Sequence, residues 1–306
     1  MRRLSVEGLS LCVSERGEGH PLLLINGIGA HTGMWRPLER ALTDVRLISF
    51  DAPGTGASET PRLPLALDAL ANVAEAVVDR LGYERVDVLG YSFGGLVAQR
   101  LARSAPHRVR RLVLAATTPG WGGVPGSLTT LMRMSTPLRY YWREYYESVV
   151  GELMGGRART DLEFVRRQGA LRRTRPPDPV GYAWQLAALA FDPGSLGWLH
   201  TLEPATLVVT GDDDPVMPLA NSLLLAHAIP KARLLVAPGE GHLLLVDPDS
   251  AALPAIHGFV TSDPPEWGDA VEVTRGMVDA ALHAEPPRHP YAVMSAFVRM
   301  FWAGFT

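Results

Sequence analysis

The chain has 306 residues, of which 47% are hydrophobic and 20% are charged, and its formal net charge is −3. This composition indicates a globular protein with a buried core and excludes a largely disordered chain. The small negative charge gives no reason to expect a nucleic-acid partner.

The sequence has a single cysteine and no stretch typical of an export signal. Cys12 is the only cysteine, which excludes an internal disulfide and cysteine metal clusters, and the histidines lack metal-ligand spacing. We therefore expect neither a metal nor another cofactor. The stretch "MRRLSVEGLSLCV" alternates apolar with polar residues, whereas an export signal needs a continuous apolar stretch. With no apolar run near the roughly 18 residues of a membrane span, we expect a cytoplasmic protein without a transmembrane segment.

Short apolar runs typical of β-strands recur along the chain, with helical patterns between them. They are "PLLLIN", "VRLISF", "VDVLG", "RRLVLAA", "ATLVVTG" and "ARLLVAP". Strands that alternate with helices predict an α/β fold, with a mainly parallel sheet flanked by helices on both faces. Residues 64–82 have apolar positions at helical spacing and end at Gly82, so they predict one of these helices.

The strand pattern stops between residues 118 and 202. This stretch is rich in Trp, Tyr, Met and Arg and is far too long for a loop, so it predicts a helical cap inserted into a core of residues 1–117 and 203–262. Residues 263–306 predict a C-terminal helical extension. Its last part, "YAVMSAFVRMFWAGF", has apolar residues near one helical face. That face would dock on a hydrophobic surface, pack on the rest of the protein or contact another subunit. The last of these alternatives would make the protein a homo-oligomer.

The stretch "VDVLGYSFGGLVAQRLA" contains the pattern Gly-x-Ser-x-Gly between a predicted strand and a predicted helix. Such a turn is so sharp that side chains two positions either side of the serine would collide, and Gly90 and Gly94 leave room. Ser92 is therefore the predicted nucleophile, held at the carboxyl edge of the sheet.

A serine hydroxyl needs a base and an acid that orients the base. "GEGHLLLV" places His242 just after the last predicted strand, and "GDDDPVMP" places three aspartates after the strand before it. This order of serine, acid and histidine is the one expected on such a sheet. Spacing alone does not separate Asp212, Asp213 and Asp214, and Glu240 is a weaker rival.

The glycine-rich turn "GIGAHTG" follows the first apolar strand run. A dinucleotide loop needs Gly-x-Gly-x-x-Gly, and here the third glycine falls one position late. That hypothesis would use Asp51 but leave Ser92 and His242 unexplained. We therefore expect an oxyanion hole made by the backbone N–H groups of Ile28 and Phe93.

These motifs resemble the α/β-hydrolase superfamily. Within it the chain is similar to the intracellular medium-chain-length poly(3-hydroxyalkanoate) depolymerases through "NGIGA", "DAPGTG", "RLVLAATTPG", "RYY", "GYAWQL", "WLH" and "GHLLL". The pattern from Gly211 to Pro218 resembles the acid loop of the superfamily and favours Asp214. The resemblance implies an α/β-hydrolase fold, cleavage of small or polymeric esters without a cofactor, and association with polyester storage granules.

The cap supplies the candidates for substrate contact. Gly27, Tyr182 and Trp184 are the predicted substrate-binding residues, although aromatic cap residues also suit the cap's own core. The arginines between 157 and 175 are expected mainly on a solvated helix face. A carboxylesterase or lipase, thioesterase, lactonase, carbon–carbon-bond hydrolase or cofactor-free haloperoxidase would use the same residues. A non-catalytic ligand receptor or granule-coating protein is the alternative outside enzymes.

Overall fold

The computed structural model describes residues 1–284, so the apolar stretch at the C-terminus lies outside the described residues. Its centre is an eight-stranded sheet with the order β1-β2-β4-β3-β5-β6-β7-β8. The strands are β1 Arg2–Val6, β2 Leu9–Arg16, β3 His20–Ile25, β4 Val45–Phe50, β5 Val86–Tyr91, β6 Val109–Ala115, β7 Ala205–Gly211 and β8 Ala232–Ala237. The six predicted strand runs correspond to β3 to β8, which confirms the predicted fold class.

β3 to β8 are parallel, whereas β1 and β2 form an antiparallel hairpin that joins the sheet beside β4. Glu7 and Gly8 turn the hairpin with φ values of 48° and 78°, the two positive values that a type I′ turn needs. The carboxyl ends of the six parallel strands share one edge, so the loops that follow these strands lie close together.

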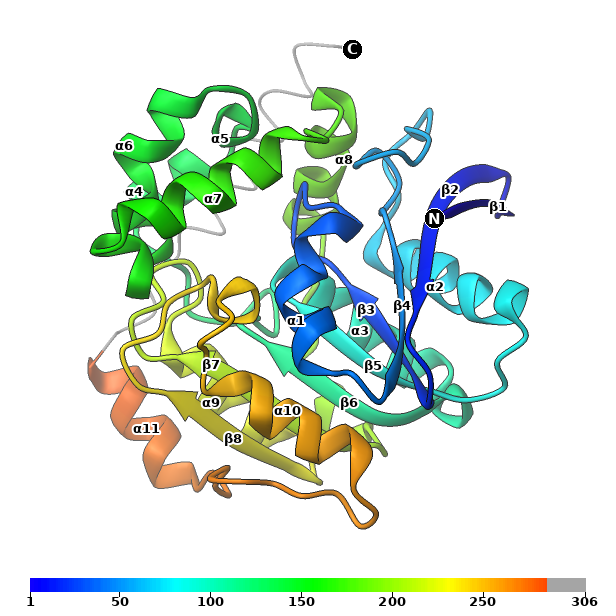
Figure 1. Ribbon diagram of the computed structural model, residues 1–306. Helices are drawn as coiled ribbons and strands as arrows, with labels where there is room; N and C mark the ends of the chain where they lie inside the picture. Colours follow the sequence, from blue (N-terminus) through cyan, green and yellow to red (C-terminus); the bar gives the residue numbers. More distant parts are fainter. Residues whose placement is uncertain (285–306) are drawn as a thin grey trace.

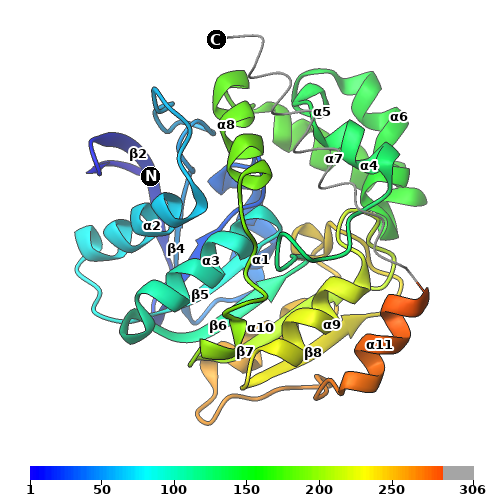
Figure 2. The same cartoon turned by 180° about the vertical axis from the view of Figure 1, so that it is seen from behind.

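Helices cover both faces of the sheet. α1 (Arg36–Ala41) and α10 (Ala252–Thr261) lie on one face (Figure 1), while α2 (Leu67–Leu81), α3 (Phe93–Ser104) and α9 (Leu219–Ala228) lie on the other (Figure 2). α11 (Arg275–Ala284) packs beside α9.

The apolar strands serve both of these layers. In β3, Leu22 and Leu24 join the apolar cluster under α1 and α10, and Leu23 and Ile25 join the cluster under α2, α3 and α9. Both faces of a central strand are therefore buried, which explains its uninterrupted apolar sequence. α2 ends where it was predicted, since its C-cap is Gly82 at φ 82°.

Between β6 and β7 the chain is helical, and we call residues 118–202 the cap. Its α-helices are α4 Leu128–Met134, α5 Leu138–Tyr141, α6 Arg143–Met154, α7 Leu162–Arg173 and α8 Pro179–Ala190. Short 3₁₀ helices complete the described chain: η1 Thr32–Trp35, η2 Pro106–Arg108, η3 Gly156–Arg159, η4 Leu199–Thr201 and η5 Leu244–Val246.

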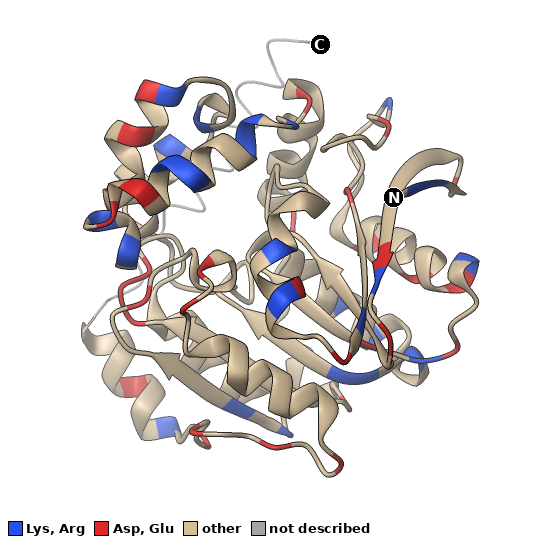
Figure 3. Cartoon of the chain, viewed as in Figure 1, with Lys and Arg blue, Asp and Glu red and all other residues tan. Residues whose placement is uncertain are grey.

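The cap sits over the carboxyl edge of the sheet (Figure 1). A third apolar cluster joins the two parts, with Leu153 and Phe164 from the cap against Leu243 and Val246 from the loop after β8. Acidic and basic residues are interspersed along α6 and α7 (Figure 3), and ion pairs such as Arg143–Glu147 lie on this outer surface. Among residues 1–284, no helix is both long enough and apolar enough to cross a membrane.

Candidate active site

Ser92 occupies the turn between β5 and α3. Its φ of 54° and ψ of −121° lie in a region that side-chain-bearing residues rarely adopt, as expected at a strained strand-to-helix turn. A Cβ added to Gly90 would lie 2.5 Å from Ala98 Cβ, and one added to Gly94 would lie 2.1 Å from the carbonyl oxygen of Ile25. The two glycines therefore provide the room that the sequence pattern predicts.

The structure brings the three predicted side chains together. Ser92 Oγ lies 3.0 Å from His242 Nε2, and His242 Nδ1 lies 2.8 Å from Asp214 Oδ2. All three residues are buried, at 4%, 4% and 7% exposure. An ionised carboxylate only accepts hydrogen bonds, so Nδ1 donates to Asp214 and Nε2 is left to accept the serine proton.

The rival carboxylates face other groups. Asp212 accepts from the Gly239 N–H, and Asp213 forms a two-pronged ion pair with Arg159 of the cap. Glu240 accepts hydrogen bonds from residues 250 and 251 of its own loop. Of the four carboxylates considered, only Asp214 therefore reaches the imidazole.

Asp214 also shapes the loop that carries it. Its Oδ1 accepts hydrogen bonds from the N–H groups of Val216 and Met217 at 2.8 and 2.9 Å, which leaves Oδ2 for His242. Both of these neighbours line the adjacent cleft. One carboxylate thus orients the imidazole and fixes part of the cleft wall.

The main chain of His242 is held from two sides. Its N–H donates to the carbonyl of Met154 in the cap at 2.7 Å, and its carbonyl accepts from the Tyr91 hydroxyl. The Tyr91 and His242 rings also pack with their centroids 5.3 Å apart. Burial raises the pKa of Tyr91, so its phenol remains a donor at neutral pH.

Tyr91 was not among the predicted site residues. Period-two alternation along β5 was a usable signal, because it places Tyr91 with Leu89 on the face toward α1 and α10, where both join the same apolar cluster. Its bond to His242 joins positions 151 apart in the sequence, so no local pattern shows it.

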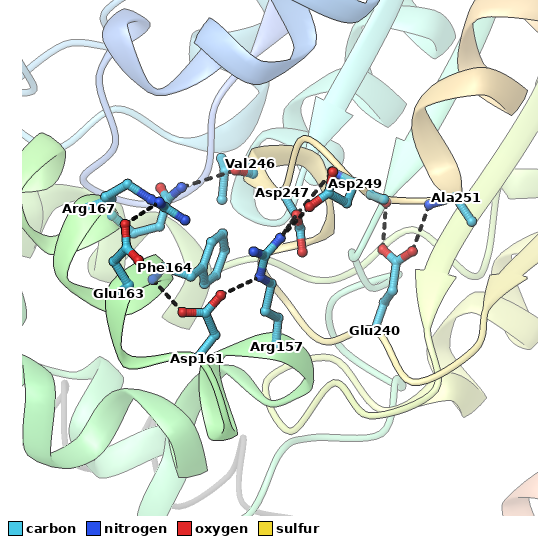
Figure 4. Close-up of polar contacts among 12 residues, drawn as sticks. Arg157, Asp161, Glu163, Phe164, Arg167, Glu240, Val246, Asp247, Asp249 and Ala251 are labelled. Carbon is cyan, nitrogen blue, oxygen red and sulfur yellow. Dashed lines mark hydrogen bonds and ion pairs between the residues drawn. The ribbon is translucent and has the colours of Figure 1, made fainter.

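Arg157 connects the cap to the loop after His242 (Figure 4). Its Nη1 donates to Asp247 at 2.8 Å and to Asp249 at 2.7 Å, and its Nε donates to Asp161 at 2.8 Å. Asp161 in turn caps the N-terminus of α7 through the Phe164 N–H. This arginine was expected on a solvated face, and instead it fastens the histidine loop to α7.

The glycine-rich turn lies beside Ser92. Ile28 and Phe93 both line the cleft, and within residues 1–284 neither N–H has a hydrogen-bond acceptor. Phe93 is the first residue of α3, so its N–H has no acceptor inside the helix. A Cβ on Gly27 would lie 3.3 Å from Ser92 Cβ. Neither of the two amides predicted for the oxyanion hole is therefore used by another described group.

Asp51 has a structural position. It is fully buried, and its two oxygens accept from the N–H groups of Thr32 at 2.6 Å and Ala57 at 2.8 Å. The carboxylate ties two loops together, and both of its oxygens accept hydrogen bonds within the protein.

A cleft that is partly open to solvent leads to Ser92. Its walls are mostly apolar. The lining residues are Ile28, Ser92, Phe93, Leu96, Thr118, Gly120, Trp121, Leu131, Met134, Ser135, Leu186, Leu189, Ala190, Asp192, Val216 and Met217.

None of the three predicted substrate-binding residues is part of this lining, although Gly27 lies beside Ser92. Tyr182 is 1% exposed, and its hydroxyl donates to the carbonyl of Met134, so it belongs to the interior of the cap. Trp184 is on the same helix and donates from its ring to the Pro61 carbonyl at 3.0 Å. The cleft is lined instead by the aliphatic side chains of Leu186 and Leu189.

Among the residues described, no group of three or more His, Cys, Asp or Glu is arranged to hold a metal ion.

Comparisons with known proteins agree with this fold. Over 267 residues the chain is 38% identical to the poly(3-hydroxyalkanoate) depolymerase of Ectopseudomonas oleovorans, covering 86% of this chain and 93% of that protein. It is 31% identical to the pimeloyl-[acyl-carrier protein] methyl ester esterase of Nitrosomonas europaea, covering 76% of this chain and 92% of the relative.

Solved structures resemble the chain as well. A hydrolase from Pseudomonas aeruginosa superimposes with a TM-score of 0.72 at 29% identity, covering 85% of this chain and 98% of that one. An esterase from Thermogutta terrifontis, at 24% identity and a TM-score of 0.70 with 84% and 97% coverage, shares the fold. The family model of the alpha/beta hydrolase fold matches residues 20–249. The chain therefore belongs to the α/β-hydrolase fold family, whose members include hydrolytic enzymes such as these.

Proposed function

We propose that the protein is a serine hydrolase that cleaves carboxylic esters through an acyl-enzyme, with Ser92 as nucleophile, His242 as base and Asp214 as the residue that orients the imidazole. The observation that carries this proposal is the pair of distances, 3.0 and 2.8 Å, that link the three side chains at the end of an apolar cleft.

The reaction has two stages. Ser92 Oγ bonds to the ester carbonyl carbon while its proton moves to His242 Nε2, and the carbonyl oxygen becomes an anion. The C–O bond to the alcohol then breaks, and the alcohol leaves with that proton. Water attacks the acyl-enzyme, gives a proton to Nε2 and releases the acid, after which Ser92 recovers its proton.

The N–H groups of Ile28 and Phe93 would stabilise the anion. Preorganised donors of this kind contribute about 3–4 kcal/mol each to the reaction step. Gly27 supports this assignment because a Cβ at this position would lie 3.3 Å from Ser92 Cβ. The absence of a side chain there leaves room beside the nucleophile for the carbonyl group of a substrate.

The cleft favours a neutral, aliphatic substrate. Asp192 is its only charged lining residue among those described, and it is paired with the buried Arg100. Burial lowers the pKa of Arg100 to about 10, so the guanidinium is still charged at neutral pH and neutralises Asp192. The remaining walls suit an alkyl chain.

We infer that the substrate is an ester of a 3-hydroxyalkanoic acid, as polymer or oligomer, acted on in the cytoplasm at the surface of a polyester granule. The 38% identity to a poly(3-hydroxyalkanoate) depolymerase supports this substrate class. The apolar cleft is compatible with it, because each repeat unit carries an aliphatic side chain.

A chain-length series tests the proposal. p-Nitrophenyl esters, the matched thioesters and emulsified poly(3-hydroxyalkanoates) are compared for wild type and Ser92→Ala. We expect wild type to hydrolyse the esters and the polymer, and Ser92→Ala to lose both activities. Equal rates for the two proteins would refute the serine mechanism. A preference for thioesters would refute the ester assignment and leave the mechanism standing.

A further inference from the structure

A single peptide group, the one between Ile28 and Gly29, is held at both ends by the cap. The Tyr140 hydroxyl of α5 donates to the Ile28 carbonyl at 2.6 Å, and the Gly29 N–H donates to Gln185 Oε1 of α8 at 2.8 Å. Both cap side chains are buried, at 1% and 3% exposure. Within the cap they come from "RYY" and "GYAWQL", two motifs whose role the proposed reaction does not explain.

The peptide is the centre of the turn that carries the Ile28 N–H. The Ala30 N–H donates to the Gly27 carbonyl at 3.1 Å, and Gly29 has a φ of 69°, the pattern of a type II turn with glycine at its third position. The turn is a unit bonded within itself, so the Ile28 N–H moves with it. Because both polar groups of its central peptide are bonded to the cap, the whole turn is held in place relative to the cap.

Aromatic rings press against the same turn. A Cβ added to Gly29 would lie 2.9 Å from the rings of Tyr140 and Tyr182, so the cap leaves no space for the turn to shift toward it. The Tyr140 ring is itself braced by the guanidinium groups of Arg139 at 4.7 Å and Arg172 at 5.7 Å. These contacts fix the phenol that bonds to the turn.

We propose that Tyr140 and Gln185 are positioning residues for the oxyanion hole: by holding the Ile28–Gly29 peptide, they keep the Ile28 N–H directed at the carbonyl oxygen of an ester attacked by Ser92. This inference rests on the proposed function. It makes the cap a part of the catalytic machinery in addition to a wall of the cleft, because an oxyanion hole aligned in this way requires a seated cap.

Two substitutions remove one bond each. Tyr140→Phe deletes the hydroxyl that donates to the Ile28 carbonyl and keeps the ring. Gln185→Leu deletes the oxygen that accepts from the Gly29 N–H. Tyr141→Phe is the matched control, since Tyr141 lies on the same helix and donates to the Pro177 carbonyl, away from the turn.

Steady-state kinetics with a p-nitrophenyl ester and inhibition by a trifluoromethyl ketone give the readout. The ketone adds to Ser92 and forms an oxyanion, so its Ki reports the hole directly. We expect each removal to lower kcat about 5- to 20-fold with KM changed less than about twofold, below the 10²- to 10³-fold loss for deleting a whole donor. The Ki should rise by the same factor as kcat/KM falls.

The double variant supplies a further criterion. Both bonds hold one peptide, so Tyr140→Phe combined with Gln185→Leu should lose less than the product of the single losses. Tyr141→Phe should stay within about threefold of wild type. The two removals act on opposite ends of the same peptide, so either one tests the proposal if the other does not fold.

The inference is overturned if the kcat values of Tyr140→Phe and Gln185→Leu equal that of Tyr141→Phe. It is also overturned if the two variants differ from wild type only in KM, or if the Ki of the ketone is unchanged. Wild-type activity that Ser92→Ala abolishes would leave the proposed function intact in each of these cases. A wild type no more active than Ser92→Ala would overturn both.

Discussion

Replacing Tyr91 with phenylalanine isolates one bond at His242, the proposed catalytic base. The change removes the hydroxyl that donates to the His242 carbonyl. It keeps the ring, which packs 5.3 Å from the imidazole and 6.2 Å from the Trp35 ring between centroids. After the change, the N–H bond to Met154 is the remaining described hydrogen bond to the main chain of His242.

The expected size of the effect follows from burial. Tyr91 is 5% exposed and His242 is 4% exposed, so water does not readily replace the lost donor. A buried carbonyl left without its partner costs about 1–3 kcal/mol of folding free energy. A displacement of the imidazole well below 1 Å is enough to slow proton transfer, and we expect kcat to fall about 10-fold with KM unchanged, since a full 1 Å costs about 100-fold.

Urea unfolding and hydrolysis of a p-nitrophenyl ester measure the two effects. Tyr83→Phe is the control, because Tyr83 precedes β5 at the opposite edge of the sheet and its phenol bonds to Glu15 and Arg46. A Tyr91→Phe protein with wild-type kcat, or a loss that Tyr83→Phe reproduces, would refute the role given to this bond.

Three further substitutions test other parts of the structure. Gly94→Ala would place a methyl group 2.1 Å from the carbonyl that ends β3, so we expect at least about 3 kcal/mol of lost stability in urea, and a loss below 1 kcal/mol would contradict the packing. Arg157→Ala should increase hydrogen exchange in residues 240–251, whereas Arg167→Ala, which breaks only an ion pair within α7, should not. Equal exchange in the two variants would argue against a role of Arg157 in holding this loop. Arg159 holds the pKa of Asp213 below its ordinary value of 3.8, so the pair stabilises the fold above that pH and the stability is lost as the pH falls through the lowered pKa. Asp213→Asn should therefore flatten the loss of stability below about pH 4 in urea unfolding, and an unchanged slope would contradict this.

Much of the fold could be predicted because burial on both faces leaves a plain mark on the sequence. Central parallel strands such as β3 and β7 have no solvent face, so their sequences lack the alternation of apolar and charged residues that marks a half-exposed strand. The tight turn at Ser92 also leaves a local mark, since Gly90 and Gly94 are the positions where a Cβ would collide. The order of serine, acid and histidine then follows from the loops at one edge of the sheet.

Other features of the site depend on contacts that sequence does not record. Asp213 and Asp214 are adjacent, and only the loop conformation turns one toward Arg159 and the other toward His242. Tyr182 has the same aromatic chemistry whether it faces a cleft or the interior of the cap, so composition favoured a substrate role that the cleft lining does not support. The bond from Arg157 to Asp247 spans 90 residues and has no local signature.

The central claim is that Ser92 becomes covalently acylated with His242 as its base. Rapid quenching of the protein with a p-nitrophenyl 3-hydroxyalkanoate, followed by proteolysis and mass spectrometry, measures this directly. We predict the mass of one 3-hydroxyacyl group on the peptide that contains Ser92, and no such adduct in Ser92→Ala or His242→Ala. Ester turnover without an adduct, or an adduct on another residue that persists in Ser92→Ala, would contradict the account.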